Sequence, residues 1–356
     1  MCPYSWSRPG GVQTHVRGLA RELRTRGIET EILAPADGPV DELGFTAAGR
    51  SLSIHDNGSV QRVALSPGAV ARTARFVRDG QFDLVHLHEP MIPAVCLTAL
   101  LASPVPLVGT FHMRAPSPRW YTVFGPVCRA ALRRLAVRMA VSESARDHVA
   151  RRCPGRYEVV PNGVEVAAGP PPGPPAERRI VFVGRPERRK GLPVLLEALR
   201  RLPLARLDLI GPEERDLPRH PDDRVAAHGR VSDGEKARLL RSAAVLCAPS
   251  LRSESFGLVI AEAFAAGVPV VASDVAGYRE LVRPDCGRLV PPGDPDALAD
   301  ALRALLSDHE ARAAASAAAR RRAEELAWPR VADRVLELYD YACASRRRPM
   351  PMTSPL

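Results

Sequence analysis

Short hydrophobic runs alternate along this chain with longer amphipathic segments. The runs are rich in Val, Leu and Ile, and the segments between them are long enough for helices. This alternation is typical of strand–helix–strand units in parallel sheets. We expect strands in the first half of the chain at 30–34, 84–87, 107–110, 138–141 and 158–160, and in the second half at 180–183, 206–210, 224–228, 245–248, 268–272 and 287–290.

A segment dense in proline and glycine separates the two sets of runs. Residues 167–175 read AAGPPPGPP, a composition that favours a linker over regular structure. The pattern therefore predicts an α/β protein with two Rossmann-like, doubly wound parallel-sheet domains facing a central cleft, where ligands bind at the carboxyl ends of the strands. The predicted parts are an N-terminal domain at 1–166, a linker at 167–178, a second domain at 179–328, a C-terminal helix at 329–344 that we expect to return to the N-terminal domain, and a disordered tail at 345–356.

The segment 258–266 predicts a buried helix that carries one carboxylate, Glu262. Every other residue in it is hydrophobic or Ala, and Gly267 followed by Pro269 indicates the helix end. An ionised carboxylate in such surroundings is strongly disfavoured unless it receives hydrogen bonds. We therefore expect Glu262 to accept hydrogen bonds from a ligand such as the vicinal diol of a ribose.

A second carboxylate, Glu254, precedes this helix. The backbone N–H groups of Phe256, Gly257 and Leu258 would be free donors at the helix N-terminus, where the helix dipole favours phosphate oxygens. Together the two carboxylates and the helix start predict a pocket for a nucleoside diphosphate sugar. The alternative is purely structural: a capping carboxylate and an ion pair within the core.

Composition and charge narrow the possible partners. The chain has 356 residues, 46% of them hydrophobic, and a net charge of +10, which favours anionic partners such as nucleic acid, anionic lipid or phosphorylated substrates. Only 5% of residues are aromatic, and no basic stretch is interleaved with stacking aromatics, so we predict no nucleic-acid binding. The seven cysteines include no Cys-x-x-Cys pair, and the N-terminus has no secretory signal, so we expect reduced thiols and a cytoplasmic location.

Several motifs occur together and in a characteristic order. They are Gly10-Gly11-Val12, Pro161-Asn162-Gly163-Val164, the loop from Gly184-Arg185 to Arg189-Lys190-Gly191, and Glu254 and Glu262 with Phe256-Gly257. This set resembles the GT-B retaining glycosyltransferases of family 4. Further stretches are similar to the actinobacterial phosphatidylinositol α-mannosyltransferases, namely Cys2-Pro-Tyr-Ser-Trp-Ser-Arg-Pro-Gly-Gly-Val-Gln-Thr-His15, Asn57-Gly-Ser-Val60, His86-Leu-His-Glu-Pro90 and Thr110-Phe-His112.

The resemblance implies transfer of mannose from GDP-mannose to the inositol ring of phosphatidylinositol, with retention at the anomeric carbon and without a metal. Arg185 and Lys190 would neutralise the departing diphosphate. Glu254 would face the donor sugar's hydroxyls, and His112 would contact that sugar near the reacting carbon. The further donor-binding residues implied are Gly10, Gly11, Asp233, Lys236, Phe256, Gly257, Leu258 and Glu262. The alternative for Arg185 and Lys190 is a solvated basic turn among Arg188 and Arg189.

The acceptor residues implied by the resemblance are Tyr4, Gln13, Asn57, Ser59 and Arg62, which would hold an inositol phosphate. The chain departs from the family at Asp56, Met113 and Ser117, which add an acid and remove a base near the expected anion site. Another inositol-like or small polar acceptor, or a different sugar nucleotide, therefore stays open. A non-catalytic nucleotide-binding relative also stays open, whereas a dehydrogenase is disfavoured because no G-x-G-x-x-G motif joins a strand to a helix.

Three further features could suggest a metal or a membrane. His86 and His88 share one face of a strand, but no third ligand is spaced to join them, so we predict no metal site. Asp294-Pro-Asp296 fits a metal-binding D-x-D pattern, but we interpret Asp294 as a helix N-cap. Residues 126–135 form an amphipathic basic segment that could lie on anionic lipid at the inner face of the plasma membrane; the alternative is a core-facing helix with a solvated Arg face.

The start of the chain differs from that of the family. Family members begin with a short apolar strand before Cys-Pro-Tyr, and here Met1 directly precedes Cys2. We therefore expect the first strand of the N-terminal domain to be truncated, and the translation start to lie upstream of Met1.

Overall fold

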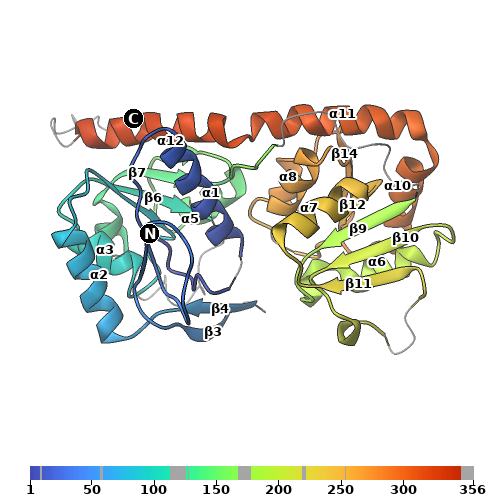
Figure 1. Cartoon of the computed structure of the whole chain (residues 1–356). Coiled ribbons are helices and arrows are strands. Elements are labelled where there is room, and N and C mark those ends of the chain that lie inside the picture. Colours follow the sequence, from blue (N-terminus) through green and yellow to red (C-terminus); the bar gives the residue numbers. More distant parts are fainter. Residues whose placement is uncertain are drawn as a thin grey trace. The chain divides into compact units, whose positions relative to one another are not determined.

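The computed structural model describes residues 1–8, 10–56, 59–112, 126, 128–166, 178–218, 222–252 and 254–345 (Figure 1). The chain divides into two compact units. Unit 1 combines Met1–Gly163 with Trp328–Leu356, and unit 2 is Val164–Ala327. The predicted linker, apart from Arg178, and the predicted tail after Ser345 lie outside the described residues, as do Asn57, Met113 and Ser117.

Unit 2 is built on a six-stranded parallel sheet. Its strands are β9 (Arg179–Val183), β10 (Arg206–Ile210), β11 (Val225–Gly229), β12 (Val245–Ala248), β13 (Val270–Ser273) and β14 (Gly287–Val290). They lie in the order β11-β10-β9-β12-β13-β14, which is the doubly wound Rossmann order. The direction of winding reverses between β9 and β12. Each of the six strands overlaps a run predicted from the sequence.

Helices cover both faces of this sheet. Ile180 and Phe182 of β9 pack in one apolar cluster with α6 (Leu192–Leu199) and α10 (Pro295–Ser307). On the other face, α7 (Asp233–Ser242) contacts β9, and α8 (Leu258–Ala265) contacts β12 and β13 (Figure 1). The helix α11 (His309–Glu325) packs on α8. The short helices η1 (Arg188–Lys190), η2 (Glu214–Asp216) and α9 (Ala276–Arg279) lie in the loops.

Unit 1 contains a second parallel sheet, of β5 (Val85–His88), β6 (Leu107–Phe111), β7 (Leu135–Ala140) and β8 (Glu158–Val159). A separate parallel pair is formed by β1 (Ile32–Ala34) and β2 (Phe45–Ala47). The Cys2 N–H donates to the Leu33 carbonyl, and the His88 N–H donates to the Met1 carbonyl, each at 3.0 Å. Met1 and Cys2 therefore occupy the central position between β1 and β5 that the sequence predicted to lack a strand.

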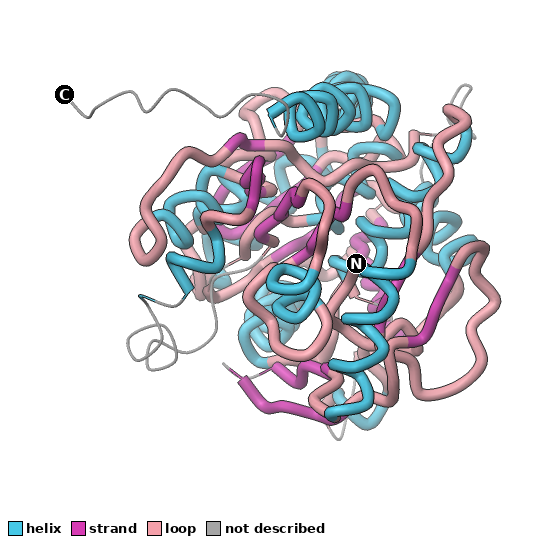
Figure 2. Tube along the Cα trace, turned by 90° about the vertical axis from the view of Figure 1, so that its left-hand side faces the viewer, coloured by secondary structure: helices cyan, strands magenta, loops and turns pink. Residues whose placement is uncertain are grey.

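The strands of unit 1 also alternate their side chains between two helical layers. Val85, Leu87 and Leu107 share a cluster with residues of α2 (Pro67–Asp79), α3 (Cys96–Ala102) and α5 (Glu143–Ala150). Val108 and Val137 pack instead against α1 (Gly11–Thr25) and α12 (Trp328–Ser345). Figure 2, which has unit 1 toward the viewer, shows helices on either side of the strands. The last helix of the chain therefore completes the core of the first unit.

An antiparallel hairpin in unit 1 was not predicted. It consists of β3 (Leu52–Asp56) and β4 (Ser59–Val63), with Leu52 opposite Val63. The sequence carried a signal for it, because Asn57-Gly58 stands between the two strands and Asn-Gly is the preferred dipeptide of tight hairpin turns.

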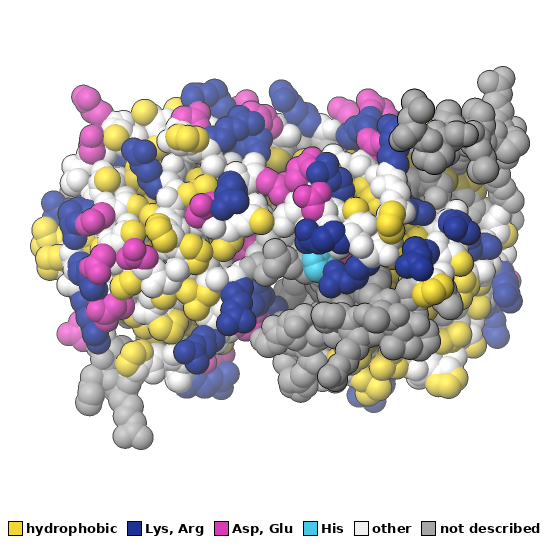
Figure 3. Space-filling view, turned by 180° about the vertical axis from the view of Figure 1, so that it is seen from behind, with side chains coloured by type: hydrophobic (Ala, Val, Ile, Leu, Met, Phe, Trp, Pro, Cys, Tyr) yellow, Lys and Arg dark blue, Asp and Glu magenta, His cyan; other side chains and the backbone are white. Residues whose placement is uncertain are grey.

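The segment proposed as a lipid-facing helix turns its apolar side inward. Cys128, Leu132 and Leu135 are buried in the core of unit 1, while Arg129 and Arg133 are exposed. This supports the alternative of a core-facing helix with a solvated Arg face. Within the described part of the chain, no helix is both long and apolar enough to cross a membrane. On the face drawn in Figure 3, basic side chains are interspersed with acidic ones over most of the surface.

Candidate active site

The carboxyl ends of β9 and β12 bring together loops that are distant in sequence. These strands are neighbours at the point where the winding of the unit 2 sheet reverses, and ligands of doubly wound sheets bind beside that point. The loop after β9 ends at Gly191, whose φ is +75° and whose added Cβ would stand 1.8 Å from the Pro249 carbonyl oxygen in the loop after β12. Only glycine allows this close approach. The Leu251 N–H completes the junction by donating to the Arg189 carbonyl at 2.7 Å.

Glu254 is the centre of this junction. Its Oε1 accepts hydrogen bonds from Lys190 Nζ at 2.7 Å, from Arg189 Nη1 at 2.8 Å and from Ser250 Oγ at 3.2 Å. The side chain is 13% exposed, so these charge-assisted bonds compensate much of its desolvation. Ser250 Oγ also lies 2.9 Å from the Tyr278 hydroxyl, and burial raises the pKa of Tyr278, so this hydroxyl stays neutral.

Ion pairs hold the side chains of the basic loop after β9. Arg185 pairs with Glu187 at 3.0 Å, and its side chain is 55% exposed. Lys190 and Arg189 both reach Glu254 from the short helix η1. The sequence singled out Arg185 and Lys190 and treated Arg189 as a neighbour. The structure adds Arg189 to the cationic group, and only the fold of the loop could show that its side chain turns inward.

The start of α8 presents backbone donors beside this group. Its N-cap is Gly257, with φ +103°, and no side chain caps the helix there. A Cβ at Gly257 would lie 2.8 Å from the Tyr278 ring, so glycine is required for both reasons. Phe256 is buried, and Leu258 is the first helical residue. The N–H groups of an uncapped first turn have no partner within their own helix, and they suit phosphate oxygens.

Glu262 has a partner from within the chain. Lys236 Nζ of α7 lies 2.8 Å from its Oε1, and 3.4 Å from Asp233. Burial nevertheless raises the pKa of Glu262 above its usual value, against the attraction of Lys236. The ion pair that the structural alternative predicted is thus present, but it compensates the buried carboxylate only in part. Hydroxyl donors from a ribose would stabilise the charged form further. Lys236, named from the sequence as a donor-binding residue, is the partner of Glu262 in this ion pair.

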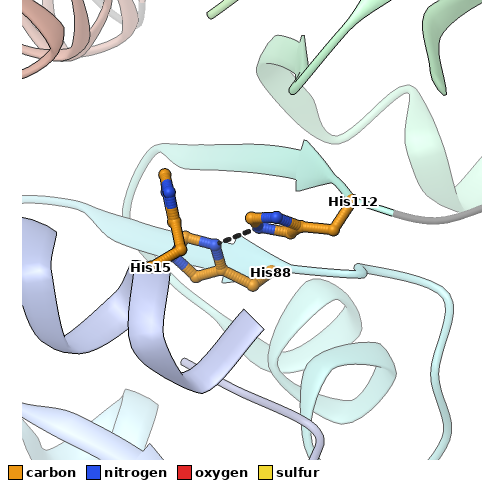
Figure 4. A group of neighbouring side chains, drawn as sticks. All are labelled: His15, His88 and His112. Carbon is orange, nitrogen blue, oxygen red and sulfur yellow. Dashed lines mark hydrogen bonds between the residues drawn. The ribbon is translucent and has the colours of Figure 1, made fainter. Parts of the chain in front are cut away.

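His112 of unit 1 follows β6 directly and is held at two places. Its backbone N–H donates to Glu89 Oε1 at 2.6 Å, and its ring Nε2 lies 2.9 Å from His88 Nδ1. The ring of His15, from α1, approaches edge-on with centroids 4.8 Å apart (Figure 4). Burial lowers the pKa of His15 to about 3 and that of His112 well below the usual 6.5. These imidazoles are therefore neutral at physiological pH.

The reason given from the sequence for excluding a metal is wrong. One ring nitrogen from each of His15, His88 and His112 lies within 4.8 Å of the others, so a third histidine does join His88. His86 does not join, since its two nitrogens lie 2.7 Å from the Tyr339 hydroxyl and from Thr110 Oγ1. The hydrogen bond between His88 and His112 directs their nitrogens at each other and not at a common ion. A bound metal would have to replace that bond.

The second metal-like motif is a helix cap. Asp294 accepts hydrogen bonds from the N–H groups of Asp296 and Ala297 at the start of α10. Pro295 is the first residue of that helix, where its missing N–H costs nothing. The interpretation of Asp294-Pro-Asp296 as a cap is confirmed.

The predicted acceptor residues do not all line one cavity. Tyr4 and Gln13 are buried, and Gln13 Nε2 donates to the carbonyls of Ser5 and Arg8, so the Gln13 side chain secures the loop before α1. Gly10 is the N-cap of α1 and Gly11 its first residue. Ser59 begins β4, and its side chain, like Asn57 as a whole, lies outside the described residues.

Arg62 lines a cavity of about 580 Å³ in unit 1. Arg8 and Arg17 also line it, and two carboxylates, Asp37 and Asp41, stand among these cations. Arg62 Nη1 lies 3.3 Å from Asp37 Oδ2. Although burial alone would raise the pKa of Asp37, hydrogen bonds from Ser51, Ser5 and Arg62 lower it to about 2. The cavity is therefore lined by fixed charges of both signs.

Comparison with known proteins identifies the family. The chain matches the family model described as Glycosyltransferase Family 4 over residues 9–168 and that of Glycosyl transferases group 1 over residues 177–308. It is 38% identical to phosphatidyl-myo-inositol mannosyltransferases of Mycolicibacterium smegmatis and Mycobacterium tuberculosis, over 96% and 97% of this chain and 92% and 97% of theirs. This chain belongs to glycosyltransferase family 4.

Other relatives extend the comparison. The family 4 chain is 32% identical to a D-inositol 3-phosphate glycosyltransferase of Xylanimonas cellulosilytica, over 96% of this chain and 93% of that one. Among solved structures, sucrose-phosphate synthase of Thermosynechococcus elongatus matches with TM-score 0.75 and 23% identity, covering 94% of each chain. Anabaena Alr3699/HepE with UDP and glucose matches with TM-score 0.75 and 18% identity, covering 95% of this chain and 98% of that one. The predicted two-domain GT-B fold is confirmed.

Besides Arg189, three residues of this glycosyltransferase were missed by reasoning from its sequence. Glu89 holds the backbone of His112, His15 packs on its ring, and Asp37 pairs with Arg62. The buried acid in His86-Leu-His-Glu-Pro90 was a usable signal for Glu89, since a carboxylate directly after an apolar strand needs a donor. No pattern in the sequence indicated the other two contacts.

Proposed function

We propose that this glycosyltransferase moves mannose from GDP-mannose to the inositol ring of phosphatidylinositol, with retention at the anomeric carbon. The structural support is the group of Lys190 and Arg189 on Glu254, next to the uncapped start of α8 at the switch point of the unit 2 sheet. The support for the sugar and the acceptor is the 38% identity to phosphatidyl-myo-inositol mannosyltransferases along almost the whole chain.

The donor-side residues suit departure of a nucleoside diphosphate. Arg185 and Lys190 supply fixed positive charge to the leaving phosphate, and the N–H groups of the first turn of α8 add hydrogen bonds. Glu254, held by two cations, accepts hydrogen bonds from the sugar's hydroxyls, and Glu262 accepts them from the ribose. These charges take the place that a metal holds in other transferases, so we propose that the reaction needs none.

The retention follows from transfer on one face of the sugar. The bond from the anomeric carbon to the diphosphate breaks, and the acceptor oxygen bonds to that carbon from the same side. The acceptor's hydroxyl proton passes to the departing phosphate oxygen. This route requires no enzymic nucleophile, and neutral His112 contributes hydrogen bonding to the sugar and not a proton.

A second candidate acceptor is a free inositol phosphate. It is favoured by the 32% identity to a D-inositol 3-phosphate glycosyltransferase and by the charged cavity around Arg62. Both acceptors place a phosphate beside a polyol, and Arg62 is the proposed phosphate partner in each case. A lipid acceptor would in addition bring this cytoplasmic protein into peripheral contact with the inner face of the plasma membrane.

The test is a panel of donors and acceptors with the purified full-length chain. GDP-mannose, UDP-glucose and UDP-N-acetylglucosamine are each offered with phosphatidylinositol vesicles, with inositol 3-phosphate and with no acceptor. We expect transfer from GDP-mannose to phosphatidylinositol, with an α linkage by NMR. Transfer from a UDP-sugar alone would refute the mannosyl assignment, and turnover with only the free inositol phosphate would select the second candidate. Absence of turnover with every pair would favour a binding role.

A further inference from the structure

Glu89 combines two unfavourable features in one residue. It directly follows β5, its φ of +55° lies in the left-handed region, and its side chain is only 5% exposed. A residue with a Cβ adopts that backbone conformation at a cost, and a buried carboxylate must be hydrogen-bonded to be tolerated. Such strain persists only where the surrounding structure holds it, and it concentrates at functional sites.

The backbone of Glu89 fixes where its carboxylate points. Its N–H donates to the Thr110 carbonyl at 2.8 Å, which continues the pairing of β5 with β6 by one residue. Its carbonyl accepts the Ile92 N–H at 3.1 Å and so closes a turn. The backbone of Glu89 is thus fixed by its N–H and by its carbonyl. Its Oε1 accepts a hydrogen bond from the His112 N–H at 2.6 Å, and His112 lies just beyond the last residue of β6.

The neighbour of Glu89 holds the other end of the same residue. His88 Nδ1 lies 2.9 Å from His112 Nε2, and the two rings are tilted by 34° relative to each other (Figure 4). Adjacent residues at the end of β5 thus hold His112 by its backbone and by its ring. The hydrogen bonds of the sheet do not hold His112, because the β5–β6 ladder ends at the pair His88 and Thr110.

We propose that Glu89 is a positioning residue for mannosyl transfer: its carboxylate fixes the backbone of His112 so that the imidazole is presented to the donor sugar. The inference rests on the proposed function, in which His112 faces that sugar. Glu89 itself touches neither substrate. Its effect is on the geometry at the reacting carbon, where displacement by about 1 Å costs on the order of 100-fold in rate.

The test compares Glu89→Ala with Glu89→Gln in the full-length chain. The alanine variant removes the acceptor for the His112 N–H, and the glutamine variant retains a side-chain oxygen of the same reach. We expect Glu89→Ala to lower kcat by about 100-fold, with the KM for GDP-mannose and the Kd for GDP within about threefold of wild type. Glu89→Gln should recover kcat to within about tenfold of wild type.

A second readout follows His112 without any turnover. In protein labelled with ¹⁵N-histidine, the ring signals of His112, identified with a His112→Gln variant, should shift in Glu89→Ala and return toward wild type in Glu89→Gln. The ring signals of His228, which belongs to unit 2, should stay in place. This readout remains available if a variant is inactive.

Asp208→Asn is the matched control. Asp208 is a buried carboxylate with 4% exposure, hydrogen-bonded to Arg179 and His228 in unit 2, and it has no role in the proposed site. We expect it to lower the melting temperature while kcat stays near wild type. Equal kcat losses in Glu89→Ala and Asp208→Asn would overturn the proposal, as would unchanged His112 signals in Glu89→Ala. If wild type transfers no mannose, the proposed function fails, whereas an active wild type with an unaffected Glu89→Ala defeats this inference alone.

Discussion

At the scale of single residues, two partly buried carboxylates are compensated to different extents. Glu254 accepts from two cations and a hydroxyl, whereas Glu262 has Lys236 and a pKa that burial still raises. Glu254 is held in a fixed position by the protein alone. Any further hydrogen-bond donor would stabilise the charged form of Glu262, as expected of a group that binds a ribose.

Glu254→Gln tests the role of the first carboxylate. The amide keeps the shape but removes the charge that fixes Lys190 and Arg189, so we expect kcat to fall by about 100-fold or more. The Kd for GDP should stay within about threefold, because the cations remain available to the diphosphate. Steady-state kinetics and calorimetric titration measure the two quantities. Glu325→Gln, which removes the charge that pairs with Arg283 and Arg322, is the control and should change neither. Normal turnover in Glu254→Gln would refute the assignment.

Asp37→Asn tests the charge balance of the unit 1 cavity. The carboxylate has a pKa of about 2, below its unfolded value, so its stabilising contribution is complete above about pH 4 and disappears as the pH falls through about 2. We expect the variant to lose about 1 kcal/mol at pH 7, since solvent screens this partly exposed group. Urea denaturation at pH 7 and at pH 2.5 measures the difference, which should narrow at the lower pH. A difference that is constant with pH would contradict the assignment to the charge.

At the scale of elements, buried and half-exposed strands differ in how well the sequence reveals them. The central strands of unit 2, β9, β12 and β13, are buried along most of their length and appear as continuous apolar runs. In β3, by contrast, Leu52 and Ile54 are exposed and alternate with polar residues. That hairpin carries too little burial to form a run, and only its Asn-Gly turn could have indicated it.

The junction of α1, β5 and β6 contains histidines whose neutral form is enforced by burial. For His15 the folded pKa is about 3, and the pKa values of His86, His88 and His112 are also lowered. As the pH falls below about 6.5, the unfolded chain binds protons first, so stability is present above that pH and is lost below it.

We therefore predict that unit 1 loses stability between pH 6.5 and 5.5. Replacing one buried histidine removes the part of this loss of stability that the histidine causes. The difference in the free energy of unfolding between wild type and His15→Gln should therefore narrow by about 1 kcal/mol over that interval. Urea midpoints followed by near-ultraviolet circular dichroism at the two pH values provide the measurement. His309→Gln, which replaces an exposed histidine of unit 2, is the control variant. A gap that widens on acidification would show that the imidazoles are not neutral.

At the scale of the whole molecule, each unit has its own parallel sheet and its own core. The chain enters unit 1 a second time at Trp328, where α12 packs on α1 and on β7. Added Cβ atoms at Gly18 and Gly163 would lie 2.2 Å and 2.3 Å from the Trp328 ring, so both glycines make room for it. The C-terminal helix is thus integral to the first unit.

The reaction as a whole should be independent of metal ions, because cationic side chains provide the charge at the proposed diphosphate site. We expect turnover with GDP-mannose to be unchanged after dialysis against a chelator and after addition of Mg²⁺. Activity lost on chelation and restored by Zn²⁺ would contradict this. If His15→Gln then abolished the restoration, the metal would be assigned to the cluster of His15, His88 and His112.

The sequence by itself determined the order of strands and helices in unit 2, the helix stop at Gly267, the cap at Asp294 and the family. These depend on local signals: runs of apolar residues, capping side chains, glycine and proline positions, and motif spacing. Tertiary structure alone decided which partners the charged and imidazole groups find. Arg189 and Lys190 meet Glu254 across 65 and 64 residues, and His15 and His112 come from different elements, because parallel strands bring distant loops to one edge of a sheet. Hydrophobic periodicity carries no information about such contacts.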